Sequence, residues 1–136
     1  MKVVIDTNVF VSSFFGGNPR KIIDLWKEGH LVLCLSDSVL NEYIDVLQRT
    51  GLKNEGEMEE LLLLFSKSYN ILFTKKTPSI RAVKSDPGDD KFIECAVALG
   101  ADVIITGDKA VRALGEYKGI DILTPHHFLK TYRWKD

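Results

Sequence analysis

Long apolar runs, cysteines and histidines are all scarce in this chain of 136 residues. A membrane-spanning helix needs about 18 consecutive apolar residues, whereas the run Leu61–Phe65 is only five residues long. Between Met1 and Asp6 stand one lysine and three apolar residues, so we expect no signal peptide. With 45% hydrophobic and 27% charged residues, residues 1–136 are expected to form a single globular domain with no contact to a membrane.

The two cysteines and three histidines argue against several kinds of site. Cys34 lies inside an apolar run and Cys95 in a helical segment, so we expect reduced thiols in or near the core of a cytoplasmic protein. His126 and His127 are adjacent, and neighbouring side chains on a helix diverge by about 100°. They cannot share a metal ion as histidines four residues apart would, and we expect no zinc site.

Short apolar runs alternate with longer helical patterns, which favours β-α-β construction with a parallel sheet. The expected strands are Lys2–Asp6, Leu31–Leu35, Asn70–Phe73, Asp102–Thr106 and Ile120–Leu123. The first and fourth are rich in Val and Ile without polar alternation, as is typical of central strands covered on both faces. The predicted fold class is therefore α/β, a three-layer α/β/α arrangement with a five-stranded parallel sheet whose first and fourth strands are adjacent.

Capping residues and glycines mark the ends of the helices between these strands. Helices are expected from Asn18-Pro19 to near Gly29, from Ser36 or Ser38 to Gly51, over Glu55–Ser68, from Asp86-Pro87-Gly88-Asp89 to about Gly100, and after Thr124-Pro125. The stretch Lys75–Ser85 is expected to be a loop.

Two aspartates follow the two central strands. Asp6 ends the first strand and Asp108 comes just after the fourth, and the carboxyl ends of parallel strands line the crevice where such sheets bind ligands. Each could instead be the N-cap of a following helix. Asn8 and Thr106 add short polar groups, so a binding site is the interpretation that we favour for Asp6.

Glu42 lies on the flank of the apolar stripe of its helix, beside Val39 and Val46. The residues three and four positions away are Ser38, Val39, Asp45 and Val46, and none is basic. A surface ion pair within the helix therefore has no local partner.

Three aspartates stand close together before the fourth helix. Asp86 is a good N-cap, and Asp89 occupies the third position of a capping box. Asp90 then has no capping role and shares an inward face with Ile93 and Val97, so it is the predicted site residue. Asp89 takes its place if the helix begins one residue later.

Four carboxylates aimed at one point would repel one another unless a cation lies among them. Oxygen ligands of this kind suit Mg²⁺ or Mn²⁺. The net charge of −1 is unpromising for a nucleic-acid ligand, but neutralising these four acids leaves 18 basic residues against 15 acidic ones. Contacts to phosphates are then allowed without being required.

With these residues in place, the chain resembles PIN-domain proteins over nearly its whole length. The opening Val-Val-Ile-Asp-Thr-Asn-Val-Phe is similar to the first strand of that family, and Ser-Asp-Ser-Val-Leu-Asn-Glu-Tyr is similar to its helix with a single essential glutamate, here Glu42. The sequence from Asp90 to Asp102 resembles the third acidic motif, and Thr106-Gly107-Asp108 the fourth. The most similar subgroup is the VapC-like class, the toxin components of toxin–antitoxin pairs.

The resemblance implies a metal-dependent endoribonuclease. Asp6, Glu42, Asp90 and Asp108 would be its catalytic and metal-binding residues, with Mg²⁺ or Mn²⁺ as the cofactor. Glu42 either ligates the metal or orients the attacking water, while Asn8 and Thr106 would hold a carboxylate or that water. The expected partners are single-stranded or structured RNA, an antitoxin protein and a second copy of the chain.

Three other interpretations can be compared with the same residues. A phosphoacceptor receiver domain needs an aspartate at the end of its third strand, and Asn70–Thr74 contains none. A haloacid-type phosphatase needs a second aspartate two residues after the first, where this chain has Asn8. A PIN-like module that binds nucleic acid or protein without cleavage remains as the alternative, although all four acids are present.

Overall fold

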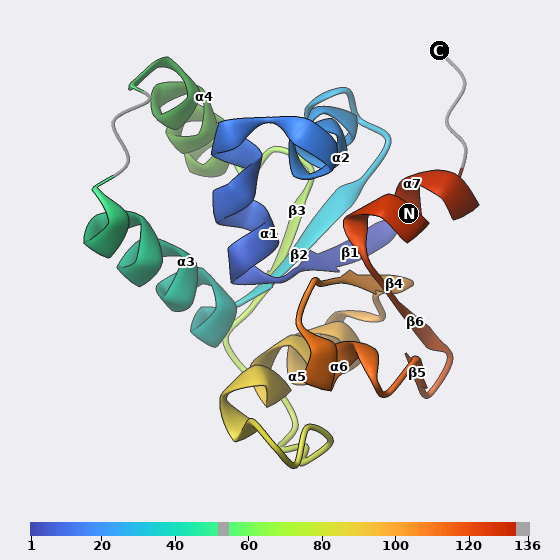
Figure 1. Cartoon of the computed structure of the whole chain (residues 1–136). Helices are drawn as coiled ribbons and strands as arrows, with labels where there is room; N and C mark the ends of the chain where they lie inside the picture. Colours follow the sequence, from blue (N-terminus) through green and yellow to red (C-terminus); the bar gives the residue numbers. More distant parts are fainter. Residues whose placement is uncertain (52–54, 133–136) are drawn as a thin grey trace.

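The computed structural model describes residues 1–51 and 55–132, which form a mixed six-stranded sheet between helices (Figure 1). The strands are β1 (Lys2–Ile5), β2 (Val32–Ser36), β3 (Ile71–Thr74), β4 (Val103–Ile105), β5 (Glu116–Tyr117) and β6 (Ile120–Leu123). Their order across the sheet is β3-β2-β1-β4-β6-β5. The predicted adjacency of the first and fourth expected strands is confirmed, since β1 and β4 pair in parallel with Ile5 opposite Ile105.

The predicted number of strands was wrong by one. All five expected strands are present and parallel to their neighbours, but β5 adds an antiparallel edge to β6. The connection is a two-residue hairpin at Lys118 and Gly119, both with positive φ, as a tight hairpin requires. Lysine is not a usual residue for that conformation, so the turn gave no signal in the sequence.

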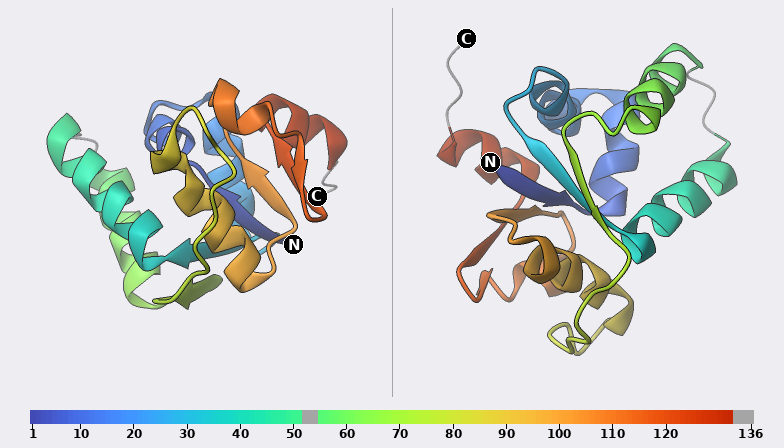
Figure 2. Two further views of the ribbon diagram at one scale, coloured as in Figure 1. Left: turned by 90° about the horizontal axis from the view of Figure 1, so that it is seen from below. Right: turned by 180° about the vertical axis from the view of Figure 1, so that it is seen from behind.

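Helices cover both faces of the sheet. They are α1 (Thr7–Ser12), α2 (Gly17–Lys27), α3 (Asp37–Thr50), α4 (Glu55–Ser66), α5 (Asp90–Leu99), α6 (Lys109–Arg112) and α7 (Pro125–Thr131), with single 3-10 turns η1 (Ser13–Phe15) and η2 (Pro87–Asp89). α5 packs across β1 to β4 on one face, while α1, α2, α4 and α7 lie toward the other (Figures 1 and 2). None of the helices in the described residues is long and apolar enough to cross a membrane.

Most predicted helix ends are confirmed. Ser36 caps α3 by accepting a hydrogen bond from the Val39 amide, and Gly51 ends α3 in the left-handed conformation. By contrast, α2 begins at Gly17, so Asn18 lies inside the helix rather than at its cap. α4 ends at Ser66 instead of Ser68, which itself has a positive φ.

The hydrophobic core runs along the central strands and continues under α1 and α3. All residues of β4 and the last three of β1 are buried, as the Val- and Ile-rich runs predicted. The rings of Phe10 on α1 and Tyr43 on α3 stack with centroids 4.2 Å apart. Cys34 and Cys95 are buried and form no disulfide, in agreement with the expected core thiols. This packing fixes α1 and α3 against the carboxyl ends of β1 and β2.

Candidate active site

The paired ends of β1 and β4 bring Asp6 and Thr106 together. The Asp6 amide donates to the Ile105 carbonyl at 2.9 Å, which extends the pairing one residue past the strands. The Thr106 hydroxyl donates to Asp6 Oδ2 at 2.5 Å, and both residues are buried. The predicted role of Thr106 as a hydroxyl beside a carboxylate therefore has a direct structural basis.

Asp6 is also the N-cap of α1. Its Oδ1 accepts a hydrogen bond of 2.8 Å from the Asn8 amide. Burial raises the pKa of Asp6 above its ordinary value, the hydrogen bonds from Thr106 and Asn8 oppose that rise, and the charges of Asp108 and Glu42 add to it. The carboxylate is thus held in place by the fold while two other acids act on its charge.

Asp108 has the capping role that was one of the two interpretations left open by the sequence. Its Oδ1 accepts hydrogen bonds from the amides of Ala110 and Val111, so it caps α6. Its own amide donates to the Thr106 hydroxyl oxygen at 3.0 Å. Thr106 therefore connects Asp6 and Asp108, and the second oxygen of Asp108 takes no part in the cap.

Glu42 reaches the site from α3. The Tyr43 hydroxyl donates to the Ile5 carbonyl, which ties this part of α3 to the end of β1. Glu42 Oε1 accepts from the Thr7 hydroxyl at 2.6 Å, and Oε2 forms an ion pair with Lys91. Partial burial alone would raise the pKa of Glu42, but the hydrogen bonds from Lys91 and Thr7 outweigh it, and the pKa is lowered.

Asp90 has a structural role that the sequence did not indicate. Its Oδ1 accepts hydrogen bonds from the amides of Ala82, at 3.0 Å, and Val83, at 2.7 Å. The side chain is 6% exposed and holds the preceding loop against the start of α5. One oxygen of Asp90 is therefore committed to the loop, as one oxygen of Asp108 is committed to the cap of α6, and no charge effect of Asp90 on Asp6 or Asp89 accompanies it.

Asp89 lies with the other acids instead. Its Oδ2 is buried and has no hydrogen-bond partner, and its side chain makes no cap for α5. Burial and the charges of Asp108, Asp86, Asp6 and Glu42 raise its pKa to about 7. The expected capping role of Asp89 was wrong because η2 interposes a 3-10 turn before α5, in which only Asp86 accepts a cap hydrogen bond. The geometry favours Asp89 over Asp90 as the third acid.

Asp6, Glu42, Asp89 and Asp108 form what we call the acidic cluster. Within residues 1–51 and 55–132, no three acidic, histidine or cysteine side chains stand as a preassembled metal-binding group. The donors nevertheless fit a hard divalent cation, because all are carboxylates and one buried oxygen, Asp89 Oδ2, has no partner. Charge repulsion inside the cluster is what such a cation would relieve.

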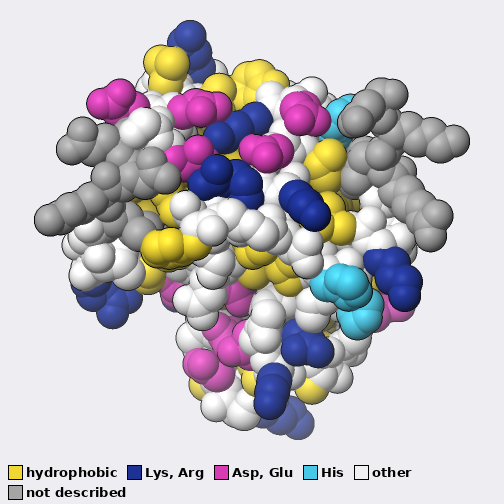
Figure 3. All heavy atoms as spheres, turned by 45° about the horizontal axis from the view of Figure 1, so that its top comes forward, with side chains coloured by type: hydrophobic (Ala, Val, Ile, Leu, Met, Phe, Trp, Pro, Cys, Tyr) yellow, Lys and Arg dark blue, Asp and Glu magenta, His cyan; other side chains and the backbone are white. Residues whose placement is uncertain are grey.

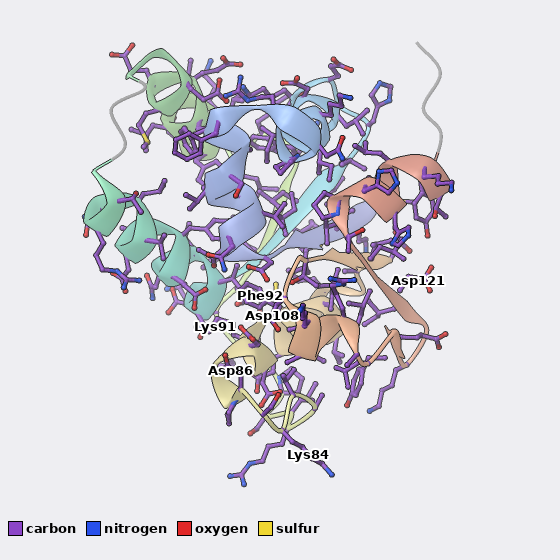
Figure 4. All side chains as sticks on the ribbon, in the orientation of Figure 1. Lys84, Asp86, Lys91, Phe92, Asp108 and Asp121 are labelled. Atoms are coloured by element: carbon purple, nitrogen blue, oxygen red, sulfur yellow. The ribbon has the colours of Figure 1, made fainter. Side chains whose placement is uncertain are left out.

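Two clefts flank the acidic cluster and meet at Asn8. One, of about 640 Å³, is lined by residues of α1, α3 and α5 that include Glu42, Arg49 and Lys91. The other, of about 670 Å³, includes Ser12, Asp108 and Lys109. Figure 4 labels Lys91 and Asp108 in the region where α5 and α6 approach α1 and α3. An extended, chain-like ligand could therefore lie across the acidic cluster, with lysine or arginine side chains on either side of it.

Among the described residues on the face drawn in Figure 3, positive charge forms no continuous patch. On the face drawn in Figure 3, Lys and Arg side chains are scattered among acidic ones. Sequence reasoning missed Lys91 and Thr7, and it named Asp89 only as the substitute for Asp90. For Lys91 the only signal was its place beside the third acidic motif.

A family model of the PIN domain matches residues 2–110 of the chain. A protein of Methanocaldococcus jannaschii, named "Uncharacterized protein MJ1680", is 35% identical over 146 aligned residues, which cover 97% of this chain and 92% of that protein. The chain therefore belongs to the PIN domain family. PIN domains are usually nucleases, which supports a hydrolase in the broad sense, and PIN nucleases typically use divalent metals.

Proposed function

We propose that this protein is a Mg²⁺- or Mn²⁺-dependent endoribonuclease that hydrolyses RNA phosphodiester bonds. The observation that carries the proposal is the buried, unpartnered Oδ2 of Asp89, a residue whose pKa is raised to about 7 by burial and by the charges of four other acids. A fold does not bury a carboxylate oxygen in this way without an energetic disadvantage. A divalent cation converts that disadvantage into binding energy.

Asp6, Asp89 and Asp108 would hold the cation, and Glu42 completes the cluster. A bound Mg²⁺ or Mn²⁺ lowers the pKa of water and stabilises the charge on the leaving oxygen. The Thr106 hydroxyl donates to the Asp6 carboxylate and accepts from the Asp108 backbone amide, so it holds the Asp6 side chain close to the backbone of Asp108. Asn8, where the two clefts meet, is the proposed amide contact to the substrate or to a water.

Single-stranded or locally unpaired RNA is the proposed substrate. The two clefts flank the acidic cluster, and each is lined by a cation, Arg49 in one and Lys109 in the other, while Lys91 is paired with Glu42. Cations at these places can contact phosphates on both sides of the bond that is cut. An extended strand follows such a path more easily than a rigid duplex does.

We further propose that the protein is the cytoplasmic toxin of a toxin–antitoxin pair. An arginine from an antitoxin would occupy the cation's place and pair with the carboxylates. A homodimer is proposed as well, because Leu62 and Leu63 on α4 are 61% and 53% exposed. A short neighbouring gene whose sequence has the pattern of a DNA-binding protein would support the antitoxin proposal. Sedimentation at tens of micromolar protein, about the concentration range of a weak interface, tests the homodimer.

The decisive experiment incubates single-stranded RNA with the protein and Mn²⁺. Cleavage should disappear with a chelator and with Asp89→Asn, and should persist in Asp121→Asn, a matched change on β6 away from the cluster (Figure 4). Loss of cleavage in Asp90→Asn, with a native fold and active Asp89→Asn, would show that the third acid is Asp90. RNA binding without cleavage under all metal conditions would favour the alternative, a PIN-like binding module.

A further inference from the structure

Glu42 differs from Asp6 in the charge of its hydrogen-bond partners. Both oxygens of each carboxylate accept hydrogen bonds, but Asp6 accepts them from neutral groups, the Thr106 hydroxyl and the Asn8 amide, whereas Glu42 accepts one from the Thr7 hydroxyl and pairs through Oε2 with the ammonium group of Lys91. Asp89 is the opposite case, since its Oδ2 has no partner. A cation in the cluster would therefore face an oxygen without a partner at Asp89 and a carboxylate already paired with a positive charge at Glu42.

Lys91 is well placed to keep this pair intact. It lies in the first turn of α5, directly after Asp90, whose hydrogen bonds to the loop fix that turn. The side chains of Lys91 and Glu42 are 25% and 29% exposed, so water screens the pair only in part. Ligation of a metal by Glu42 would bring the metal beside the positively charged ammonium group of Lys91, or would break the contact between Lys91 and Glu42.

We propose that Lys91 is a positioning residue that keeps Glu42 out of the cation's ligand set, so that Asp6, Asp89 and Asp108 alone hold the ion. The proposal rests on the proposed function. The ion pair neutralises one of the four acidic charges and leaves three for a divalent cation. Glu42 then remains an anion next to the ion, in a fixed orientation, and can accept a hydrogen bond from the attacking water.

The test measures Mn²⁺ affinity by calorimetry on full-length protein without RNA. The informative variant is the double substitution Lys91→Met with Glu42→Gln, which removes the pair without a change in net charge. We expect its Kd to lie within about twofold of wild type, as for a change outside the ligand set, while Asp89→Asn binds about tenfold more weakly or worse. A double variant that loses as much affinity as Asp89→Asn would overturn the proposal, because Glu42 would then be a ligand.

Lys91→Met alone frees the Glu42 carboxylate and should tighten Mn²⁺ binding. Lys109→Met is the matched control, since it removes one positive charge from the other cleft, beside Asp108. The proposal is supported if Lys91→Met increases the Mn²⁺ affinity more than Lys109→Met does. It is contradicted if the two variants increase the Mn²⁺ affinity equally. In RNA cleavage, Lys91→Met should lower kcat, and Lys91→Arg should restore it.

Failure of the proposed function is distinguishable from failure of this inference. A wild type that binds no Mn²⁺ removes the proposed function. The free energies of unfolding of the two single variants and the double variant, without metal, then decide whether Lys91 and Glu42 interact at all. Additive free energies would show that the pair does not exist and would end the inference as well.

Discussion

Replacing Asp89 with asparagine should stabilise the metal-free protein at neutral pH. The substitution keeps the shape of the side chain and removes the charge that burial and the neighbouring acids oppose. The difference between an ordinary pKa of 3.8 and one of about 7 corresponds to about 4 kcal/mol if fully expressed. Because Asp89 is only partly buried, solvent screening reduces this figure, and we expect about 1–2 kcal/mol.

The stability difference between wild type and Asp89→Asn should depend on pH in a way that identifies its cause. The pKa of Asp89 is higher in the folded protein than in the unfolded chain, so the unfolded state loses its proton first as the pH rises. Wild type therefore loses stability relative to the variant between about pH 4 and pH 7, and the difference is constant above that range. Glu42, with its lowered pKa, acts in the opposite sense, but it is present in both proteins and largely cancels in the comparison.

Urea unfolding of both proteins with a chelator, at several pH values from 4 to 8, measures this difference. At pH 7.5 the variant should also melt about 3–8 °C higher. Saturating Mn²⁺ should reverse the order, because the cation stabilises the wild type by RT ln(1 + [L]/Kd) and the variant much less. A variant that is less stable than wild type at pH 7.5 without metal would refute the argument that Asp89 is a repelled, unpartnered carboxylate.

Three further substitutions separate structural from functional roles. Asp90→Ala removes the acceptor of two backbone hydrogen bonds and should lower the free energy of unfolding in urea by about 2–3 kcal/mol, while the folded fraction still binds Mn²⁺. Asp108→Asn keeps a good helix cap, so stability should change by less than about 0.5 kcal/mol while RNA cleavage is lost. Thr106→Val removes the donor to Asp6 and should raise the pKa of Asp6 further, which carbon-13 NMR titration of that carboxyl group would detect.

The sequence was sufficient for the parts of the fold that local patterns determine. The uninterrupted Val and Ile of β1 and β4 predicted two central strands, and Ser36 with Gly51 predicted both ends of α3. Since parallel strands end at one edge of a sheet, the meeting of Asp6 with Thr106 and Asp108 followed from those strands. The edge strand β5 did not follow, because Lys118 is an unusual residue for a left-handed turn.

The third acid shows where local patterns fail. A capping box assumes that the helix begins directly after the cap, whereas a 3-10 turn here shifts the side-chain directions of Asp89 and Asp90. The hydrogen-bond partners of Asp90 are backbone amides of the loop, and because every residue but proline has such an amide, the sequence could not indicate them. Glu42 likewise had no local basic neighbour, because its ion-pair partner, Lys91, belongs to a different helix.

The central position of β1 has a consequence for synthesis of the chain. β1 is made first, yet one of its edges pairs with β4, which is made near the end, and Asp108 comes after β4. A growing chain that has not yet released β4 from the ribosome has an open β1 edge and an incomplete acidic cluster. A chain that stops before Asp108 therefore cannot assemble the proposed site, so a truncated product would lack nuclease activity even if its first strands and helices had formed.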